Sequence, residues 1–508
     1  MRAAPGAPVT PAALPHDLLV IGGGVNGAGI ARDAAGRGLR VLLCEQDDLA
    51  AHTSSASTKL IHGGLRYLEH YEFRLVRKAL AEREVLLAVA GHIIRPLRFV
   101  LPHEPHLRPA WMIRAGLFLY DHLARRRRLP GSEGVDLRHH PAGAPLRAGY
   151  AQGFAYSDAW VDDARLVVLN ALDAHERGAE ILTRTRCTRI VREQGTWTAT
   201  LVDEHGARRL ARARAVVNAT GPWVGSFLDQ ATPVRSRRAV RLVKGSHVVV
   251  PRLFEHDYAY IFQNVDRRII FAIPYEREFT LVGTTDVEFH GDAARARIGT
   301  DEISYLCELV SRHFRRSVSP AEVLWSYSGV RPLLEDESAD PSSVTRDYSF
   351  ELDADGAPLL SVFGGKLTTY RRLAEEALAR LLPLLGVAPA RWTATAPLPG
   401  GDLPGGGFAA FRSALSERYP GFPAPLLDRW ARAYGTRLPG WLGAARAPGE
   451  LGAEVLPGLY AAEIQYLRSS EWARTAEDIL WRRSKLGLHL PPDAAAQLAG
   501  WLDREPAG

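Results

Sequence analysis

The sequence predicts an α/β fold in three parts. They are a domain with a parallel sheet assembled from discontinuous segments, an interleaved β-rich domain, and an all-α C-terminal domain. Near the N-terminus a short apolar strand runs into a glycine turn and then a helix. Apolar runs separated by turns fill residues 240–330, and helical periodicity dominates residues 408–508. A chain of 508 residues is long enough for two or three domains.

The first segment has the order of a nucleotide-binding unit. The apolar strand Leu18–Ile21 leads into Gly22, Gly24 and Gly27, which have the G-x-G-x-x-G spacing. Without Cβ atoms such a turn lets a pyrophosphate approach the backbone, and the positive end of the following helix faces that anion. A second apolar strand then ends at Glu45, where an acid is expected for a ribose hydroxyl. We therefore predict a dinucleotide site here.

Later segments repeat this arrangement. The apolar strand 214–218 ends in Ala219-Thr220-Gly221, where backbone can again pass close to a dinucleotide. The strand 360–363 leads into Gly364-Gly365-Lys366 and then a helix over residues 371–385. Small hydroxyl residues followed by His-Gly-Gly, at residues 53–64, suggest a loop close to the same ligand. The nucleotide-binding domain is therefore expected to be discontinuous within residues 17–395.

Periodicity and composition predict the remaining organisation. Residues 1–16 are rich in Ala and Pro without the apolar core of a signal peptide, so we expect a flexible N-terminal extension. The β-rich part is expected mainly at residues 240–330, together with residues 70–150. Residues 156–165 predict the start of a helix, with acids in its first turn. The Pro/Gly-rich stretch 396–407 is predicted to be a linker before the helical domain 408–508.

Charge and cysteine usage narrow the functional classes. The net charge of +6 is small for this length and does not argue for nucleic acid, although it favours an anionic substrate or membrane surface. The 3 cysteines are far apart and form neither a disulfide framework nor a zinc pattern, which fits a reducing compartment and predicts no metal site. No window approaches about 18 uninterrupted apolar residues, so no spanning helix is expected.

One aromatic and basic segment leaves two interpretations open. Residues 107–128 form an apolar stretch that ends in a run of arginines. The segment fits an interfacial membrane helix, and it fits equally a half-buried helix whose basic end is solvated.

Several stretches together carry a family resemblance. They are residues 20–30, 53–69, 156–165, 218–224, 283–286, 327–333 and 363–370. The chain resembles the aerobic, FAD-dependent glycerol-3-phosphate dehydrogenase family, in its bacterial, membrane-associated, quinone-reducing form. The resemblance spans residues 17–385 and continues more loosely through the helical C-terminus. The set is specific, whereas the glycine motif alone would fit many unrelated enzymes.

The resemblance implies that the dinucleotide is FAD, bound non-covalently. It implies the pyrophosphate at the first glycine turn, the adenosine ribose at Glu45, and the flavin near residues 53–62 and 364–369. The residues that it assigns to FAD are Gly22, Gly24, Asn26, Gly27, Glu45, Thr53, Ser54, Ser55, Ser57, Lys59, Leu60, His62, Ala219, Thr220, Gly221, Gly364, Gly365, Lys366, Leu367 and Thr368.

The resemblance also implies the reaction. sn-Glycerol 3-phosphate would be oxidised to dihydroxyacetone phosphate, with hydride passing from C2 to flavin N5 and electrons on to a membrane quinone. This chemistry needs a cationic phosphate clamp, a group that stabilises the developing alkoxide, and a proton acceptor. We expect Arg331 and Lys366 to be catalytic cations that also bind substrate, with Arg66 and Tyr67 as further substrate-binding residues.

The general base is left open by the sequence. His62 suits the role by residue type, since an unperturbed imidazole titrates at about pH 6.5. The alternative is a histidine that only hydrogen-bonds the flavin or the loop backbone. Thr285 and Asp286 are weaker candidates, and Asp286 is as well suited to an orienting or structural carboxylate.

Rival functions also follow from the same residues. One is an oxygen-reducing glycerol-3-phosphate oxidase, and another is a related FAD amine or amino-acid oxidase, which would need only a carboxylate clamp. A rival from another class is a flavin-binding interaction protein without turnover. The family resemblance further implies a homodimer. The absence of a spanning helix and the basic aromatic segment 107–128 predict a cytoplasmic protein held peripherally on the inner face of the cytoplasmic membrane.

Overall fold

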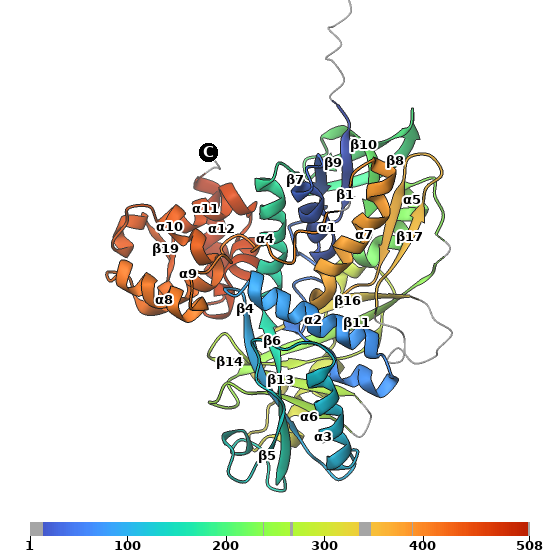
Figure 1. Cartoon of the computed structure of the whole chain (residues 1–508). Helices are drawn as coiled ribbons and strands as arrows, with labels where there is room; N and C mark the ends of the chain where they lie inside the picture. The colour runs from blue at the N-terminus through green and yellow to red at the C-terminus, as the bar shows by residue number, and fades with distance from the viewer. Residues whose placement is uncertain (1–13, 237, 265–267, 335–346, 389, 506–508) are drawn as a thin grey trace, which may run out of the picture.

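The computed structural model describes residues 14–236, 238–264, 268–334, 347–388 and 390–505. Most of the predicted N-terminal extension therefore lies outside the described residues. Two large sheets lie one above the other, and the helical C-terminal domain packs at one side of them (Figure 1). The α/β fold in three parts is confirmed.

The first sheet is the nucleotide-binding sheet, with the strand order β17-β18-β10-β1-β2-β7. Strands β18, β10, β1, β2 and β7 run parallel, β17 pairs antiparallel at the edge, and β8 and β9 continue from β10 as an antiparallel ribbon. The bounds are β1 (His16–Ile21), β2 (Val41–Cys44), β7 (Glu180–Leu182), β8 (Thr185–Glu193), β9 (Thr196–Asp203), β10 (Arg208–Asn218), β17 (Ser349–Asp353) and β18 (Leu359–Phe363).

Alternation along β1 explains the layers on either side of this sheet. Leu18 and Val20 pack into the core under three helices, whereas Leu19 and Ile21 pack toward β8, β9 and a further helix. The three helices are α1 (Val25–Gly36), α4 (Asp163–Glu176) and α7 (Tyr370–Leu385), and the further one is α5 (Val224–Ala231). Both faces of β1 are thereby buried from Leu18 to Ile21, which is why this part of the strand is uniformly apolar.

The second sheet has the order β15-β11-β14-β13-β12-β4-β6-β3, with β16 beside β11 and β5 beside β6. It combines segments that are far apart in the chain, and α2 (Phe73–Val89), α3 (Ala110–His122) and α6 (Thr300–His313) accompany it. Its strands are β3 (Leu60–Ile61), β4 (Ile94–Pro102), β5 (Glu133–Asp136), β6 (Gln152–Val161), β11 (Val240–Pro251), β12 (Ala259–Gln263), β13 (Ile269–Tyr275), β14 (Phe279–Gly283), β15 (Val287–Glu288) and β16 (Trp325–Leu334).

The C-terminal domain has its own core around Trp430 and packs beside α4 (Figure 1). Its helical elements are α8 (Gly407–Arg418), α9 (Ala424–Tyr434), α10 (Leu438–Leu442), α11 (Ala461–Glu471), the π-helical segment Asp478–Arg483 and α12 (Ala494–Arg504). The domain also contains a short hairpin, β19 (Glu454–Leu456) and β20 (Leu459–Tyr460), so the expectation of helices alone is corrected there.

Two local predictions are also corrected. The predicted helix start at residues 156–165 is wrong for its first half, because β6 continues to Val161 and α4 begins at Asp163. Every residue of β6 from Gly153 onward is buried, so the strand lacks the alternation that would have revealed it. The linker 396–406, which the structure describes throughout, forms neither helix nor strand. It is packed nonetheless, since Leu398 is 1% exposed and donates its N–H to Val89 O at 2.8 Å.

Candidate active site

A cavity of about 460 Å³ is lined by residues of both sheets, a volume that suits a bound organic molecule. It brings together most of the residues that the sequence singled out. Those that line it are Gly22, Gly24, Asn26, Glu45, Thr53, Ser54, Ser57, Leu60, His62, Tyr67, Ala219, Thr220, Gly221, Arg331, Gly364, Gly365, Lys366, Leu367 and Thr368. As far as the described residues define the cavity, Gly27, Ser55, Lys59 and Arg66 do not line it.

The first glycine turn closes one end of the cavity with backbone. Gly22 has a φ of +112°, and a Cβ on it would lie 2.4 Å from Ala219 O. A Cβ on Gly27 would lie 1.9 Å from Gly22 O, so this residue packs helix α1 against the strand end rather than lining the cavity. Gly24 caps α1, whose first turn contains no acidic residue. The helix N-terminus therefore suits an anion such as a pyrophosphate.

The second glycine turn meets the first through Asn26. The Asn26 Nδ2 donates a hydrogen bond to Gly364 O at 3.0 Å, and a Cβ on Gly365 would lie 2.6 Å from the same nitrogen. Both glycines have positive φ, at +72° and +109°. The Asn26 Oδ1 atom is buried and has no hydrogen-bond partner among the described residues. A buried acceptor beside the cavity without a donor fits a bound group that supplies one, as a dinucleotide would.

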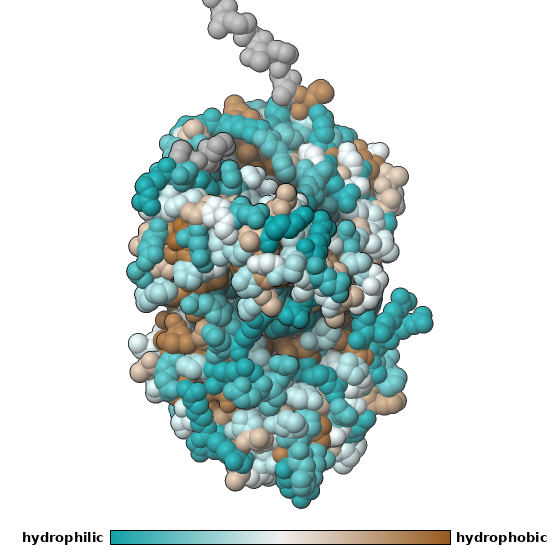
Figure 2. Space-filling model, turned by 90° about the vertical axis from the view of Figure 1, so that its left-hand side faces the viewer, coloured by the Kyte–Doolittle hydropathy of each residue, from teal (hydrophilic) through white to brown (hydrophobic). Residues whose placement is uncertain are grey.

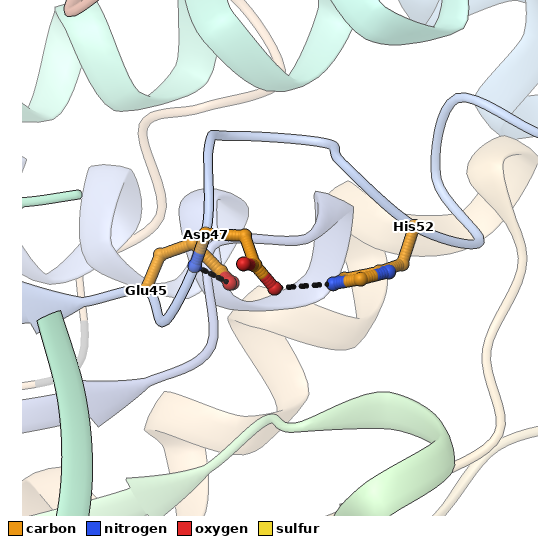
Figure 3. A group of neighbouring side chains, drawn as sticks. All are labelled: Glu45, Asp47 and His52. Atoms are coloured by element: carbon orange, nitrogen blue, oxygen red, sulfur yellow. Dashed lines mark hydrogen bonds and ion pairs between the residues drawn. The ribbon is translucent and has the colours of Figure 1, made fainter. Parts of the chain in front are cut away.

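Glu45 begins the loop after β2 and uses both carboxylate oxygens locally. Its Oε2 accepts from the N–H of Gly23 at 2.6 Å and its Oε1 from the N–H of Asp47 at 2.9 Å. Burial raises the pKa of Glu45, and these N–H donors oppose the shift. The nearby His52 Nε2 lies 2.7 Å from Asp47 Oδ2, which lowers the pKa of Asp47 (Figure 3).

Glu45, Asp47 and His52 offer ligand atoms within 4.8 Å of one another, a spacing that a metal ion could use. Since both oxygens of Glu45 already accept backbone N–H groups, we attribute the group to shaping the loop and the cavity wall.

The loop that follows is held by hydroxyl groups and one buried ion pair. Thr53 Oγ1 donates to Val330 O at 2.7 Å, and Ser54 Oγ accepts from the N–H of Val25 at 3.0 Å. Lys59 Nζ lies 2.7 Å from Asp163 Oδ1 and also donates to Ser55 O at 3.0 Å. Burial lowers the pKa of Lys59, while Asp163 opposes the shift. Lys59 and Ser55 therefore shape the loop from behind.

A second part of the cavity wall carries two cations, Arg331 and Lys366. Arg331, from β16, forms an ion pair with Asp286 and donates through Nη2 to Thr284 Oγ1 at 3.2 Å. A Cβ on Gly245 would lie 2.4 Å from Arg331 Nη2, so glycine leaves room for the guanidinium. Lys366 Nζ lies 3.9 Å above the ring of Tyr67, a cation–π arrangement. Two cations with positioned partners form a site for a small anionic substrate.

His62 and His247 are two imidazoles at or beside this cavity. His62 lines the cavity, and its backbone N–H donates to Thr368 Oγ1 at 3.1 Å. His247 is buried, stacks on Tyr327 with ring centroids 4.9 Å apart, and has Nε2 2.9 Å from Oγ1 of Thr58, which lines the cavity. Burial, with Arg331 and Lys59 nearby, lowers the pKa of His247 well below its usual value, so this imidazole is neutral near pH 7.

Sequence reasoning missed part of the cavity wall. His247 was missed, as were Arg186, Cys187 and Thr188 of β8, and Trp223, whose ring makes an edge contact with His52 at 4.8 Å. The β8 residues sit in an ordinary-looking strand, and only the way β8 folds back beside β2 places them on the cavity. No sequence signal marks them.

Comparisons with known proteins agree with this geometry. A family model described as FAD dependent oxidoreductase matches residues 17–371, and one described as the C-terminal domain of alpha-glycerophosphate oxidase matches residues 391–501. The chain is 55% identical to a glycerol-3-phosphate dehydrogenase of Pseudomonas aeruginosa, over 98% of this chain and 97% of the relative. It is 51% identical to a D-erythritol 1-phosphate dehydrogenase of Brucella abortus, over 96% and 97%.

A solved structure is also similar. It is the glycerol-3-phosphate dehydrogenase from Bacillus halodurans complexed with FAD, with a TM-score of 0.77 and 28% identity. The similarity covers 97% of this chain and 90% of that one.

Proposed function

The chain belongs to the family of FAD dependent oxidoreductases, and we propose that it oxidises sn-glycerol 3-phosphate to dihydroxyacetone phosphate. The observation that carries the proposal is that Arg331 and Lys366 line the same cavity as two glycine turns that suit a dinucleotide. The full-length similarity to glycerol-3-phosphate dehydrogenases supports this choice of substrate.

The FAD fits the residues that are present. The glycine turns of β1 and β18, the loop 45–58 and the strand end at Ala219 would hold it, and Asn26 Oδ1 offers it an acceptor. Glu45 is proposed to bind the adenosine ribose, since its carboxylate lies at the cavity wall beside the first glycine turn. When bound, FAD accepts the hydride that leaves C2 of the substrate.

The cations divide the work of binding and charge stabilisation. The Arg331 guanidinium offers the planar fork that binds a phosphate with two parallel hydrogen bonds, and Asp286 and Thr284 keep the fork oriented. Lys366 carries a compact charge suited to stabilising the alkoxide that develops at O2, with the Tyr67 ring holding its ammonium in place. Arg66 does not line the cavity that the described residues form, and we propose only that its positive charge attracts the anionic substrate from outside the cavity wall.

The proton of the C2 hydroxyl passes to one of two imidazoles. His62 lines the cavity directly, whereas His247 is neutral and reaches the cavity through the hydroxyl of Thr58. The variants His62→Asn and His247→Asn separate them: loss of the true base lowers kcat about 100-fold or more and removes its limb from the pH profile. Loss of a histidine that only orients its neighbours leaves the shape of the pH profile unchanged.

The test of the substrate is an anaerobic absorbance titration of the purified holoenzyme. We expect the flavin band to bleach with sn-glycerol 3-phosphate and to ignore glycerol and D-amino acids, which lack the phosphate. D-erythritol 1-phosphate belongs in the panel because a relative at 51% identity has that name. Faster bleaching with the erythritol phosphate would reassign the substrate, and bleaching by D-amino acids alone would replace the proposal with an amino-acid oxidase.

The proposed electron acceptor is a membrane quinone. Reoxidation by a quinone analogue much faster than by air supports it, and the reverse order would indicate an oxygen-reducing oxidase. A holoenzyme whose flavin ignores every substrate would favour the interaction protein instead. Assembly as a homodimer is proposed from the family resemblance, and light scattering measures it.

Peripheral attachment to the inner face of the cytoplasmic membrane is part of the proposal. Across the described residues, no helix is both long and apolar enough to span a bilayer. The helix α3 buries only Leu117 and Tyr120, and it exposes Trp111 by 69% and Phe118 by 59% in a basic segment. Aromatic side chains beside arginines suit an anionic lipid surface. Cosedimentation with anionic vesicles at low salt should weaken in Trp111→Ser, and an enzyme that stays in the supernatant contradicts attachment.

A further inference from the structure

The loop at residues 45–58 forms much of the cavity wall and has no regular secondary structure to fix its shape. The structure describes these residues throughout, and they form neither helix nor strand. Glu45, His52, Ser54 and Ser57 are among the loop residues that line the cavity. An irregular segment has many backbone conformations, so contacts from outside the loop must select the one that binds a ligand.

Asp48 supplies the main contact of this kind. It lies within the loop and is 2% exposed. Its Oδ2 accepts from Arg482 Nε at 2.6 Å and from Arg483 Nη1 at 2.7 Å, and its Oδ1 accepts from Arg483 Nη2 at 2.8 Å. A carboxylate buried this deeply is tolerated only when charged donors satisfy it, so the loop conformation and the arginine positions depend on each other.

The two arginines are anchored in the C-terminal domain. Arg483 also donates to Glu471 O, through Nη2 at 2.6 Å and Nε at 3.2 Å. Arg482 Nη2 donates to Asp478 Oδ1 at 2.5 Å, and Asp478 Oδ2 accepts from Arg184 Nη2 at 2.6 Å. The arginines thus join the core of the helical domain to the loop after β2.

The preceding residue contacts the second sheet. Trp481 stacks on Trp325 of β16, with ring centroids 4.2 Å apart and an angle of 18° between the planes. The same strand carries Arg331. Consecutive residues of the π-helical segment therefore contact both the cofactor loop and the strand of a proposed catalytic residue. The face of the molecule on the side of the helical domain is mostly hydrophilic (Figure 2), whereas Arg482 and Arg483 are buried beneath the surface.

We propose that the helical C-terminal domain is a clamp on the cofactor site. Arg482 and Arg483 hold the loop 45–58 in its FAD-binding conformation through Asp48, and so raise the affinity for FAD. They are positioning residues. The proposal depends on FAD being the cofactor and is independent of which substrate is oxidised.

The test compares two bidentate arginine–carboxylate pairs whose carboxylates, Asp48 and Glu463, are both buried. The variant Arg483→Lys keeps the charge at Asp48 but removes the fork. The control Arg429→Lys does the same to Arg429, whose Nη1 and Nη2 each lie 2.7 Å from an oxygen of Glu463 within the helical domain. Each apoprotein is titrated with FAD by the quenching of flavin fluorescence, and its Tm is measured without FAD.

We expect Arg483→Lys to raise the Kd for FAD about tenfold or more, the size of coupling between linked sites. Arg429→Lys should lower the Tm comparably and leave the Kd unchanged. Asp48→Asn should weaken FAD binding as well. The double variant Asp48→Asn/Arg483→Lys should lose less binding free energy than the two single variants added together, because both substitutions remove the same interaction. An unchanged Kd in Arg483→Lys, or an equal change in the control, would overturn the clamp.

Hydrogen exchange of the unmutated chain gives a second test that needs no variant to fold. Coupling is reciprocal, so FAD should protect residues 478–485 together with residues 45–58. Protection of the loop alone contradicts the proposal. Failure of the unmutated apoprotein to bind FAD would instead refute the cofactor assignment, so the two failures are distinguishable.

Discussion

Two parts of the cavity wall differ in the groups that line them. We call the part around the first glycine turn the cofactor end and the part around Arg331 and Lys366 the substrate end. At the cofactor end the first glycine turn lines the cavity with backbone, and the fit is steric: a Cβ on Gly22 would lie 2.4 Å from Ala219 O. At the substrate end the wall is side chains, and the fit is electrostatic, through Arg331 with Asp286 and Lys366 over Tyr67. A steric site fails all at once when an atom is added, whereas an electrostatic site weakens in proportion to the interaction that is removed.

The largest effect is expected at the cofactor end. Gly27→Ala should abolish flavin retention and lower the free energy of unfolding by about 2 kcal/mol or more, because α1 must move away from the strand end. The absorbance of the purified protein and its Tm measure both. Gly116→Ala in α3 is the control: its Cβ would meet no atom within 4 Å among the described residues, so flavin stays bound. A yellow Gly27→Ala protein would contradict the steric account.

At the substrate end the cofactor should survive the loss of a catalytic cation. Arg331→Gln is expected to lower kcat/KM for glycerol 3-phosphate about 100- to 1000-fold, while the flavin spectrum and content stay unchanged. Arg331→Lys should recover only part, since a point charge cannot replace the fork. Steady-state kinetics with the holoenzyme measure this. Loss of flavin from Arg331→Gln would contradict the assignment of Arg331 to the substrate end alone.

Substitution of Tyr67 at the same end should lower kcat/KM less than the loss of Arg331 does. Tyr67→Phe keeps the ring under Lys366 and should lower kcat/KM about threefold to tenfold at most. Tyr67→Ala removes the ring that holds the ammonium and should cost more. Equal losses in the two variants would mean that the hydroxyl, and not the ring, is what matters.

The smallest effect is expected away from both ends. His489 lies 4.0 Å from Glu276 and 3.5 Å from Glu278, and the interaction with these carboxylates, Glu276 above all, raises the pKa of its imidazole. The folded chain therefore binds this proton more tightly than the unfolded chain does. The stabilisation is complete below about pH 6.5 and is lost as the pH rises through the raised value.

At about pH 6, His489→Gln should lower the Tm, with a loss of less than about 1 kcal/mol in the free energy of unfolding. At about pH 9 its Tm should match that of the unmutated chain. Neither FAD affinity nor KM should change. A Tm difference that grows with pH would contradict the sign of the shift.

The steric end of the cavity could be predicted in detail, and the electrostatic end only as a set of residue types. Gly22 and Gly365 were found because positive φ and close approach leave glycine as the residue that fits. Arg331 and Lys366 were found beside small-residue turns, but their partners, Asp286 and Tyr67, come from other segments that only the tertiary structure brings close. Lys59 was assigned to the cofactor from its motif, whereas the structure buries it against Asp163.

The sequence by itself determined the local units: the strand, glycine turn and helix near the N-terminus, its repeat at residues 360–385, and the helical C-terminal part. Such units depend on short-range sterics and on hydrophobic periodicity, which neighbouring residues encode. Tertiary structure alone decided that Asp48 is held by Arg482 and Arg483, and that His247 lies behind Thr58. These partners are hundreds of residues apart or lie on different strands, and only burial in a shared core makes their pairing necessary.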